Sequence, residues 1–329
     1  MKLICGPMAT ISHPAFRILI EKFGGCDEYF TEMINAGTLL TKGPFEKFYI
    51  DPAPVPQKIV WQLTGKNNEQ MIEASKILVE LPCIGIDLNM GCSAPDIYRF
   101  GSGIAWMLKP IEETQAMVRG IRQVISDYNK EHNQNKRFSV KLRLGDDDFT
   151  DQGFFDFCNM LCDSGVELLT LHPRTKKEKL TRPARYEYCE KLAEVMHKRN
   201  VKVYLNGNVK DKASYDYALS KAPQVDGVMI SRASIEKPWI FAQLKGLEGQ
   251  VDLKQIAFDF IDDVEKYQPT EFWKTRLQRF FTYYSNNFKF SHYAQTQFLN
   301  AKDNADLKNR LEDFFAKCSD EQFVNFNKL

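Results

Sequence analysis

The chain has 329 residues, a formal net charge of +1 and 26% charged residues. This length suits a large α/β domain with an appendage. A charge so close to neutral excludes a polycationic protein that holds nucleic acid by its bulk charge, so an anionic partner would need a local basic patch.

Cysteine usage and the lack of long apolar runs limit the class of protein further. Eight cysteines occur, and Cys158 and Cys162 form the only close pair. Because no second Cys or His pair has zinc-like spacing, we expect this pair to lie on a helix face that is turned into the protein core, and we expect no metal site. No apolar run of about 18 residues occurs, and the start, MKLICGPMA, turns polar at once. We therefore predict a cytoplasmic protein without a membrane segment. We also predict a monomer.

Short apolar runs alternate with amphipathic segments over the first 240 residues, which indicates parallel strands joined by helices. Strands are predicted at 3–5, 28–31, 59–62, 84–88, 139–142, 168–171, 201–205 and 225–230. Helices are predicted at 68–79, 111–128, 153–164, 186–198 and 212–220. Two of these helices begin near the capping-type residues Asp151 and Asp211.

An open doubly wound sheet would show the same alternation, so the ends of the predicted strands decide the fold. Polar or special residues follow every strand, and a closed barrel brings all eight carboxyl ends to one rim. An open sheet would spread them over about 40 Å. The predicted fold is therefore α/β, a TIM (β/α)8 barrel followed by a smaller C-terminal all-helical domain. We place the barrel at 1–243 and the helical domain at 252–329, because 246–249 has linker composition and the later pattern is helical.

The most prominent stretch of the helical part runs from 272 to 293, where aromatic residues alternate with Lys274, Arg276 and Arg279. Such a mixture can grip phosphates and stack on bases. It also fits a bundle with an aromatic core and a solvated basic face, which the residues alone favour.

The stretch 86–103, IDLNMGCSAPDIYRFGSG, ends the fourth predicted strand and presents Asn89, Cys92 and Arg99. A thiol and a guanidinium on a loop at the carboxyl end of a strand occupy the place where an α/β barrel carries its chemistry. The structural alternative is that Cys92 is a small buried hydrophobe, as free cysteines commonly are.

Charged residues also interrupt the fifth strand and follow the sixth. Lys141 lies between Val140 and Leu142 in an apolar strand, which is costly unless its ammonium faces an anion or a polar cofactor. Arg143 points to the same side and either shares that role or pairs with a carboxylate of the 146–148 run. His172 and Arg174 follow the sixth strand, where a functional and a structural role for the histidine are equally open.

Two motifs after the last two strands are typical of phosphate binding. Asn206, Gly207 and Asn208 form a turn after the seventh strand, and Ser231 and Arg232 follow the eighth. The corresponding loops of α/β barrels form the usual phosphate site, together with the N-terminus of a short helix.

The first 240 residues resemble the tRNA-dihydrouridine synthases of the bacterial type, which are flavoproteins with a (β/α)8 barrel and a C-terminal helical domain. Seven motifs carry the resemblance in family order: GPMA (6–9), QLTG (62–65), DLNMGC (87–92), VKLRLG (140–145), LHPRT (171–175), NGN (206–208) and SRASIEKPWIF (231–241). The resemblance implies FMN-dependent reduction of specific uridines in tRNA to 5,6-dihydrouridine, with NADPH as the reductant.

The resemblance also implies roles for individual residues. Cys92 takes the position of the general acid. FMN would be held by Pro7, Met8 and Ala9 at the flavin ring, Gln62 and Lys141 at its polar edge, His172 at the cofactor or the uridine, and Asn206, Gly207, Asn208, Ser231 and Arg232 at the phosphate. The candidate tRNA contacts are Asn89, Arg99, Arg143, Arg174, Lys274, Arg276 and Arg279.

The sequence departs from the family pattern at three positions. Ser93 replaces the usual Pro after the cysteine, Pro173 the usual Gly after the histidine, and Ser231 the usual Gly before the phosphate arginine. These changes bear on fine geometry more than on reaction class. Two alternatives remain: an FMN-dependent oxidoreductase acting on a free small molecule of the dihydroorotate or enone type, and a catalytically inactive RNA-binding relative.

Overall fold

A computed structural model describes residues 1–146, 148–178 and 181–326. Residue 147 of the predicted carboxylate run and the last three residues of the predicted helical domain lie outside the described residues. The strands of the main sheet are β1 (Lys2–Cys5), β2 (Glu28–Phe30), β3 (Ile34–Asn35), β4 (Ile59–Thr64), β5 (Gly85–Met90), β6 (Arg137–Arg143), β7 (Leu168–His172), β8 (Lys202–Asn206) and β9 (Gly227–Ile230).

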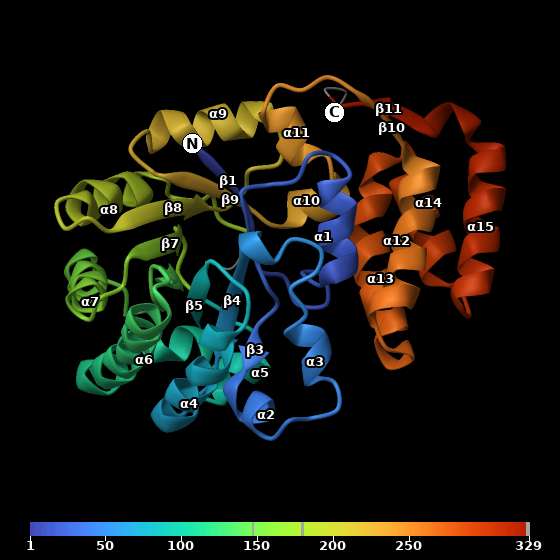
Figure 1. The fold of residues 1–329 in the computed structure, drawn as a ribbon. Coiled ribbons are helices and arrows are strands. Elements are labelled where there is room, and N and C mark those ends of the chain that lie inside the picture. The colour runs from blue at the N-terminus through green and yellow to red at the C-terminus, as the bar shows by residue number, and fades with distance from the viewer. Residues whose placement is uncertain (147, 179–180, 327–329) are drawn as a thin grey trace.

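Every pairing in this sheet is parallel, and pairing of β2 with β4 closes it into a barrel (Figure 1). The eight predicted strands match β1, β2 and β4 to β9 within a few residues, so the predicted barrel is confirmed. The short β3 was not predicted, because its two residues are too few to show a periodic pattern. It pairs with β4 beyond the point where β2 ends.

Helices surround the barrel (Figure 1). They are α1 (Pro14–Glu21), α2 (Ala36–Leu40), α3 (Glu46–Tyr49), α4 (Asn68–Glu80), α5 (Pro95–Arg99), α6 (Ile111–His132), α7 (Asp151–Asp163), α8 (Glu187–His197), α9 (Lys212–Lys221), α10 (Arg232–Glu236) and α11 (Ile240–Leu244), with 3-10 turns η1 (Pro56–Lys58) and η2 (Gly103–Met107). All five predicted helices are present. Asp211 caps α9, but α7 is capped by Thr150, whose hydroxyl accepts from Gly153 N, and Asp151 is already helical. Cys158 on α7 is buried and Cys162 is half-buried.

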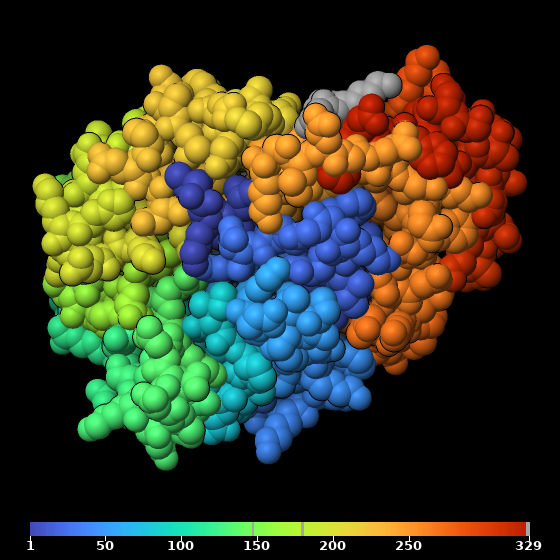
Figure 2. All heavy atoms as spheres, turned by 45° about the horizontal axis from the view of Figure 1, so that its top comes forward, coloured from blue at the N-terminus to red at the C-terminus, as the bar shows by residue number. Residues whose placement is uncertain are grey.

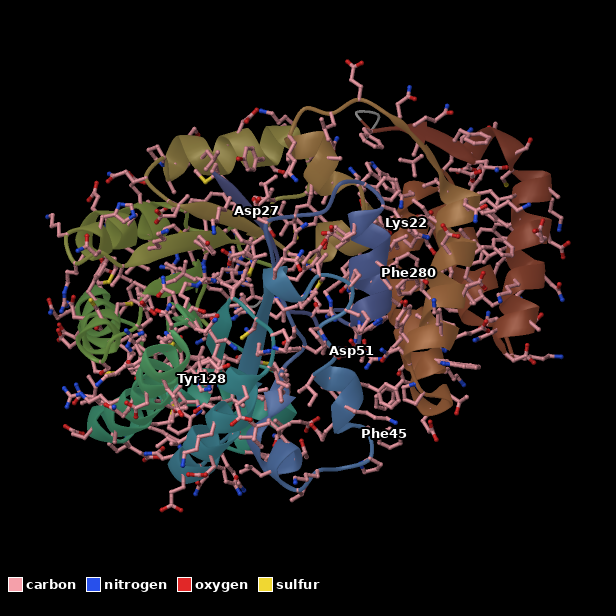
Figure 3. All side chains as sticks on the ribbon, viewed as in Figure 1. Lys22, Asp27, Phe45, Asp51, Tyr128 and Phe280 are labelled. Carbon is pink, nitrogen blue, oxygen red and sulfur yellow. The ribbon has the colours of Figure 1, made fainter. Side chains whose placement is uncertain are left out.

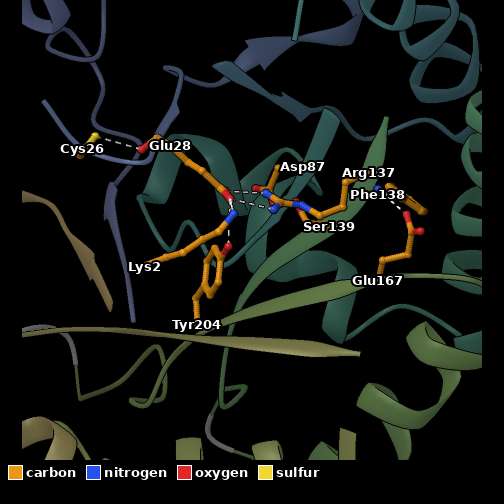
Figure 4. A network of polar contacts seen from close by, with 9 residues as sticks. All are labelled: Lys2, Cys26, Glu28, Asp87, Arg137, Phe138, Ser139, Glu167 and Tyr204. Carbon is orange, nitrogen blue, oxygen red and sulfur yellow. Dashed lines mark hydrogen bonds and ion pairs between the residues drawn. The ribbon is translucent and has the colours of Figure 1, made fainter. Parts of the chain in front are cut away.

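A buried carboxylate, Glu28, lies at the end of the barrel opposite the rim (Figure 4). Its oxygens accept two hydrogen bonds from the Arg137 guanidinium, at 3.0 and 2.7 Å. Lys2 Nζ and the Tyr204 hydroxyl donate to it at 2.7 and 2.9 Å. The charge of Glu28 is therefore matched and hydrogen-bonded, which a buried carboxylate requires.

We expect Glu28→Gln to reduce the pH dependence of the unfolding free energy in acid. Burial alone would raise the pKa of Glu28, but the hydrogen bonds and charge of Arg137, with those of Lys2, lower it to about 2. The pKa of a glutamate in an unfolded chain is about 4.3. Since the folded pKa is the lower one, this stabilisation is complete above about pH 5 and is lost as the pH falls towards 2.

Urea unfolding at about pH 7 and pH 3.5 measures this difference. The Glu28→Gln protein should be less stable at neutral pH and should lose less stability on acidification than the unaltered protein. Glu80→Gln at the exposed end of α4 is the matched control and should leave the pH dependence unchanged. Equal acid sensitivity of the Glu28→Gln and unaltered proteins would contradict the expectation.

The C-terminal part contains α12 (Leu253–Tyr267), α13 (Thr270–Tyr284), α14 (Ser291–Leu299) and α15 (Asn304–Lys317), with 3-10 turns η3 (Ser285–Asn287) and η4 (Ser319–Glu321). We predicted an all-helical domain, but the structure also contains two short strands here. β10 (Gln250–Asp252) and β11 (Phe323–Asn325) form an antiparallel pair. These strands are three residues long, below the length at which alternation shows. The division at 243 and 252 stays a prediction.

Four aromatic residues of the 272–293 stretch lie in the core of this C-terminal part. Phe280, Phe281, Tyr284 and Phe288 are buried. Phe280 stacks on Phe260 of α12 with ring centroids 3.9 Å apart. The aromatic-core interpretation therefore holds for these four rings, which are not available for stacking on bases.

The C-terminal helices pack against the N-terminal segment of the barrel. Figure 2 shows this segment, in blue, between the barrel and the orange and red helices. Lys22, just after α1, pairs with Asp259 of α12 at 2.7 Å. Phe45 contacts Phe272 of α13 with centroids 5.1 Å apart. Lys22, Phe45 and Phe280 mark this boundary in Figure 3.

Candidate active site

Two adjoining cavities, of about 640 and 280 Å³, open at the carboxyl ends of the barrel strands. Both are lined by Pro7, Met8, Lys141, Arg143 and His172. The larger is also lined by Asn206, Gly207, Asn208, Ser231 and Arg232, and the smaller by Ala9, Gln62, Asn89 and Cys92. The structure thus brings together all predicted cofactor residues and the candidate acid, although their roles stay predictions.

A tight turn and a short helix form one end of the larger cavity. Gly207 has φ +138° and Asn208 has φ +56°, so the NGN turn uses backbone conformations that favour Gly and Asn. Asn206 Nδ2 donates to the Met229 carbonyl at 2.9 Å and ties the turn to β9. Arg232 begins α10 directly after Ser231. This end presents backbone and guanidinium donors suited to a phosphate.

The larger cavity is strongly cationic. Its charged lining residues are Lys141, Arg143, Lys210 and Arg232, against Glu236 as the one carboxylate among the lining residues that the structure describes. Burial, and then the charge of Arg143, lower the pKa of Lys141 to about 8. An anionic ligand in this cavity would further stabilise the ammonium form of Lys141, so the donor set fits an anionic cofactor.

A series of buried hydrogen bonds leads from the barrel interior to the Cys92 loop. Gln62 Nε2 donates to Asp87 Oδ2 at 2.8 Å, and Asn89 Nδ2 donates to Gln62 Oε1 at 2.8 Å. Asn89 Oδ1 then accepts the backbone N–H of Cys92 at 2.9 Å. Burial raises the pKa of Asp87 to about 6, although the hydrogen bonds from Gln62 and Ser139 oppose this rise. Asn89, predicted to contact tRNA, thus holds the loop through Oδ1 and is itself tied to Gln62 through Nδ2.

The backbone of Cys92 is also held from the other side of its loop. Ile104 N donates to the Cys92 carbonyl at 3.0 Å. Gly103 has φ +64°, and a Cβ at this position would lie 2.4 Å from that carbonyl oxygen. A glycine is therefore required where η2 meets the loop, which explains one of the glycines in the 86–103 stretch.

The predicted tRNA-contacting arginines lie in different surroundings. Arg99 is 70% exposed and pairs with Asp96 at 3.2 Å, outside both cavities. Arg143 lines both cavities and donates from Nε to the Gly91 carbonyl at 3.0 Å. Arg174 is fully buried and reaches His172, so the RNA cannot touch it without a rearrangement of the fold.

On α13 the structure separates the three predicted basic residues. Lys274 and Arg279 are exposed. Arg276 is buried and its Nη1 pairs with Glu32 Oε1 at 2.6 Å. Because the guanidinium is enclosed between α13 and the barrel, Arg276 is not on a surface that an RNA can reach. We correct its assignment from a substrate contact to a buried ion pair.

Two residues of the C-terminal part line the larger cavity without having been predicted: Tyr283 and Asn286. Asn286 Nδ2 donates to Glu236 Oε2 at 3.0 Å, and Asn287 Nδ2 donates to the Glu236 carbonyl at 2.6 Å. These bonds hold α10, which carries Arg232. The residues around Asn286 do not indicate its contact with Glu236, because the two residues are about fifty positions apart in the chain.

Over the described residues, no cluster of three or more His, Cys, Asp or Glu side chains is placed to hold a metal ion. Of the helices in the described part of the chain, none is both long and apolar enough to cross a membrane.

Comparison with known proteins gives the family. The family model described as dihydrouridine synthase (Dus) matches residues 3–328. A "Probable tRNA-dihydrouridine synthase" of Aquifex aeolicus is 30% identical over 263 residues, 79% of this chain and 78% of that protein. One of Staphylococcus aureus is 25% identical over 331 residues, 97% and 94% of the two chains. Among solved structures, a morphinone reductase mutant aligns with a TM-score of 0.49 and 12% identity over 74% of this chain and 86% of its own. The match to the family model covers nearly the whole chain, and the protein therefore belongs to the dihydrouridine synthase family.

Proposed function

We propose that this protein reduces specific uridines in tRNA to 5,6-dihydrouridine, with FMN as the bound cofactor and NADPH as the reductant. The observation that carries the proposal is a pair of adjoining cavities that share five lining residues, one cavity lined by the NGN turn and Arg232 and the other by Cys92. Family membership and the names of the relatives support the same activity. A cytoplasmic location and a monomeric state are kept as predictions.

The residues present fit FMN. The backbone of the NGN turn, with Ser231 and Arg232, would hold the phosphate, and Met8 with its neighbours Pro7 and Ala9 would contact the ring. Lys141 and Gln62 would face the polar edge of the ring, where an ammonium stabilises negative charge. When bound and reduced, the flavin supplies the hydride that adds to C6 of the uracil.

Cys92 would supply the proton that completes the reduction. Once C6 had received the hydride, the electron pair of the C5=C6 bond would take up the Sγ proton of Cys92 at C5, and the S–H electrons would remain on sulfur. Water then returns a proton to the thiolate, and two electrons from NADPH balance each turnover.

The decisive experiment measures dihydrouridine in tRNA by mass spectrometry of its nucleosides. Purified protein with FMN and NADPH is incubated with tRNA from cells that lack dihydrouridine, and we expect the product to appear at specific positions. Absence of product from every such tRNA would overturn the proposal. Turnover of a free enone or dihydroorotate would then point to a small-molecule enzyme, and a protein that binds no FMN would point to an inactive RNA-binding relative.

We further propose that residues 252–329 contact the tRNA, through Lys274 and Arg279 among others. Charge reversal of both residues to Glu should weaken tRNA binding. Each contact between a basic side chain and a phosphate releases counterions from the tRNA, and this favourable contribution is lost with the contact. The slope of log Kd against log salt concentration should fall by roughly one for each lost contact. Titration of tRNA at several salt concentrations measures this slope.

Lys202→Glu is the control, because Lys202 is exposed at the amino end of β8, opposite the rim. It should leave both the affinity and the salt slope unchanged. If charge reversal at Lys274 and Arg279 changes the salt slope of tRNA binding no more than Lys202→Glu does, these residues do not contact the tRNA and only form a solvent-exposed face of the helix.

A further inference from the structure

The imidazole of His172 and the guanidinium of Arg174 are in direct contact beneath the NGN turn. Arg174 Nη1 lies 2.7 Å from His172 Nε2. His172 is 8% exposed and Arg174 is 0% exposed, so water does not compete for this contact. A Cβ at Gly207 would lie 3.5 Å from Arg174 Nη1 and 3.5 Å from His172 Cδ2, which places both groups directly under the turn.

The direction of this hydrogen bond is fixed by chemistry. A guanidinium carries only donors and stays protonated in proteins, so Nε2 must be the acceptor. An imidazole whose Nε2 accepts is neutral and carries its single proton on Nδ1. The other tautomer, or an imidazolium, would place one N–H against another at 2.7 Å.

The guanidinium is itself held in place. Arg174 Nε donates to the Arg182 carbonyl at 2.6 Å. The side chain is enclosed on all sides. It therefore cannot turn away to let His172 change its proton position without leaving a bonded and buried arrangement.

The surroundings of His172 also oppose protonation. The charged groups with the largest effect on the ring are all cationic: Arg143 and Lys141 of β6, Arg174 after β7, and Arg232 of α10. Burial first, and then these charges, hold the pKa of His172 far below the ordinary histidine range. These effects and the contact with Arg174 both favour the neutral ring.

The proton on Nδ1 is left for a ligand. His172 lines both cavities, and among the residues that the structure describes no hydrogen bond uses Nδ1. A neutral N–H beside a cationic cavity can donate to an oxygen of the ring system or pyrimidine bound there. It cannot deliver a proton in the reaction, because a ring that loses Nδ1–H without first gaining a proton would become an imidazolate.

We propose that Arg174 is a positioning residue that fixes His172 as the neutral Nδ1–H tautomer, so that His172 is a hydrogen-bond donor to a carbonyl oxygen in the cavity and not a proton source. The identity of the acceptor rests on the proposed function; the tautomer does not. The consequence for the reaction is that His172 is excluded as the proton donor, which is consistent with the acid role proposed for Cys92.

The test is a long-range ¹H–¹⁵N correlation spectrum of the flavin-loaded protein labelled with ¹⁵N-histidine. The chain has five histidines, and His172→Gln assigns the relevant signals. We expect one protonated nitrogen, Nδ1, and one unprotonated nitrogen, Nε2, with no change between about pH 5 and 8, a range that spans the ordinary histidine pKa of about 6.5. A protonated Nε2, or an imidazolium that appears within this range, would overturn the proposal.

Variants of Arg174 test the cause. Arg174→Met removes the donor and should give a mixture of tautomers, whereas Arg174→Lys keeps a donor and should retain the Nδ1–H form. Arg99→Met, at an exposed site outside both cavities, should leave the spectrum unchanged. An unchanged tautomer in Arg174→Met would refute the positioning role. If Arg174→Met does not fold, the Arg174→Lys spectrum and that of the unaltered protein still decide.

Activity separates this inference from the proposed function. In a protein that reduces tRNA, Arg174→Met should lower kcat with little change in KM for tRNA, and Arg174→Lys should restore part of the loss. If the spectra are as expected but no tRNA is reduced by the unaltered protein, the proposed function fails and the tautomer assignment stands.

Discussion

Cys92→Ala is expected to lower the rate of dihydrouridine formation by about 10²- to 10⁴-fold, the usual contribution of a positioned general acid. Binding of FMN and tRNA should persist, because the Cys92 loop is held by its backbone N–H to Asn89 and its carbonyl to Ile104, and both bonds survive the change. The measurement is single-turnover dihydrouridine formation by pre-reduced protein, alongside flavin absorbance and tRNA titration.

Two further variants sharpen this test. Cys92→Ser should remain strongly impaired, since a hydroxyl is a far weaker acid than a thiol. Cys162→Ala, at a half-buried free cysteine of α7, should retain full activity. Product formation by Cys92→Ala at the rate of the unaltered protein would rule out the acid role.

Arg276→Met should lower the free energy of unfolding by about 3–5 kcal/mol, the cost of leaving a buried charge without its partner. Arg276 and Glu32 have side chains only 2% and 6% exposed, and their contact of 2.6 Å joins α13 to the loop after β2. Among the residues that the structure describes, the backbone N–H of Thr10 would remain as the one hydrogen-bond donor to Glu32. Urea unfolding followed by circular dichroism measures the change.

The double variant Glu32→Gln, Arg276→Met separates the ion pair from simple packing. It removes the unpaired charge, so it should recover much of the stability lost in Arg276→Met. Lys274→Met, on the exposed face of the same helix, should change the free energy of unfolding by no more than about 0.5 kcal/mol. A loss in Arg276→Met no larger than that in Lys274→Met would show that the pair contributes nothing.

The barrel could be predicted because its strands are buried on both faces and therefore read as short apolar runs. Lys141 within such a run, and the polar residues that follow each strand, also indicated which end of the barrel carries the cavities. These signals are local. They need only the residues of one strand and the loop after it, so the predicted cofactor residues gather where the strand order implies.

The partners of buried charges could not be predicted in the same way. Arg276 and Lys274 are both basic residues in one aromatic stretch, yet only Arg276 meets a carboxylate, and that carboxylate lies 244 positions earlier. Arg143 ends one barrel strand and Arg174 follows the next, but Arg174 folds back under the NGN turn instead of facing the cavities. In each case burial depends on a contact between distant segments, which periodicity and composition do not encode.

The hydrogen-bond series that ends at Cys92 has a direction. At one end an ionised Asp87 can only accept, and at the other end the backbone N–H of Cys92 can only donate, so the amides of Gln62 and Asn89 can each adopt a single orientation. Shape alone therefore does not make a substitution acceptable here. Glu at 62 would set a carboxylate against Asp87, and Asp at 89 would lose the donor that Gln62 requires. Changes of one atom in these side chains should disturb the thiol loop more than changes of several atoms at its surface.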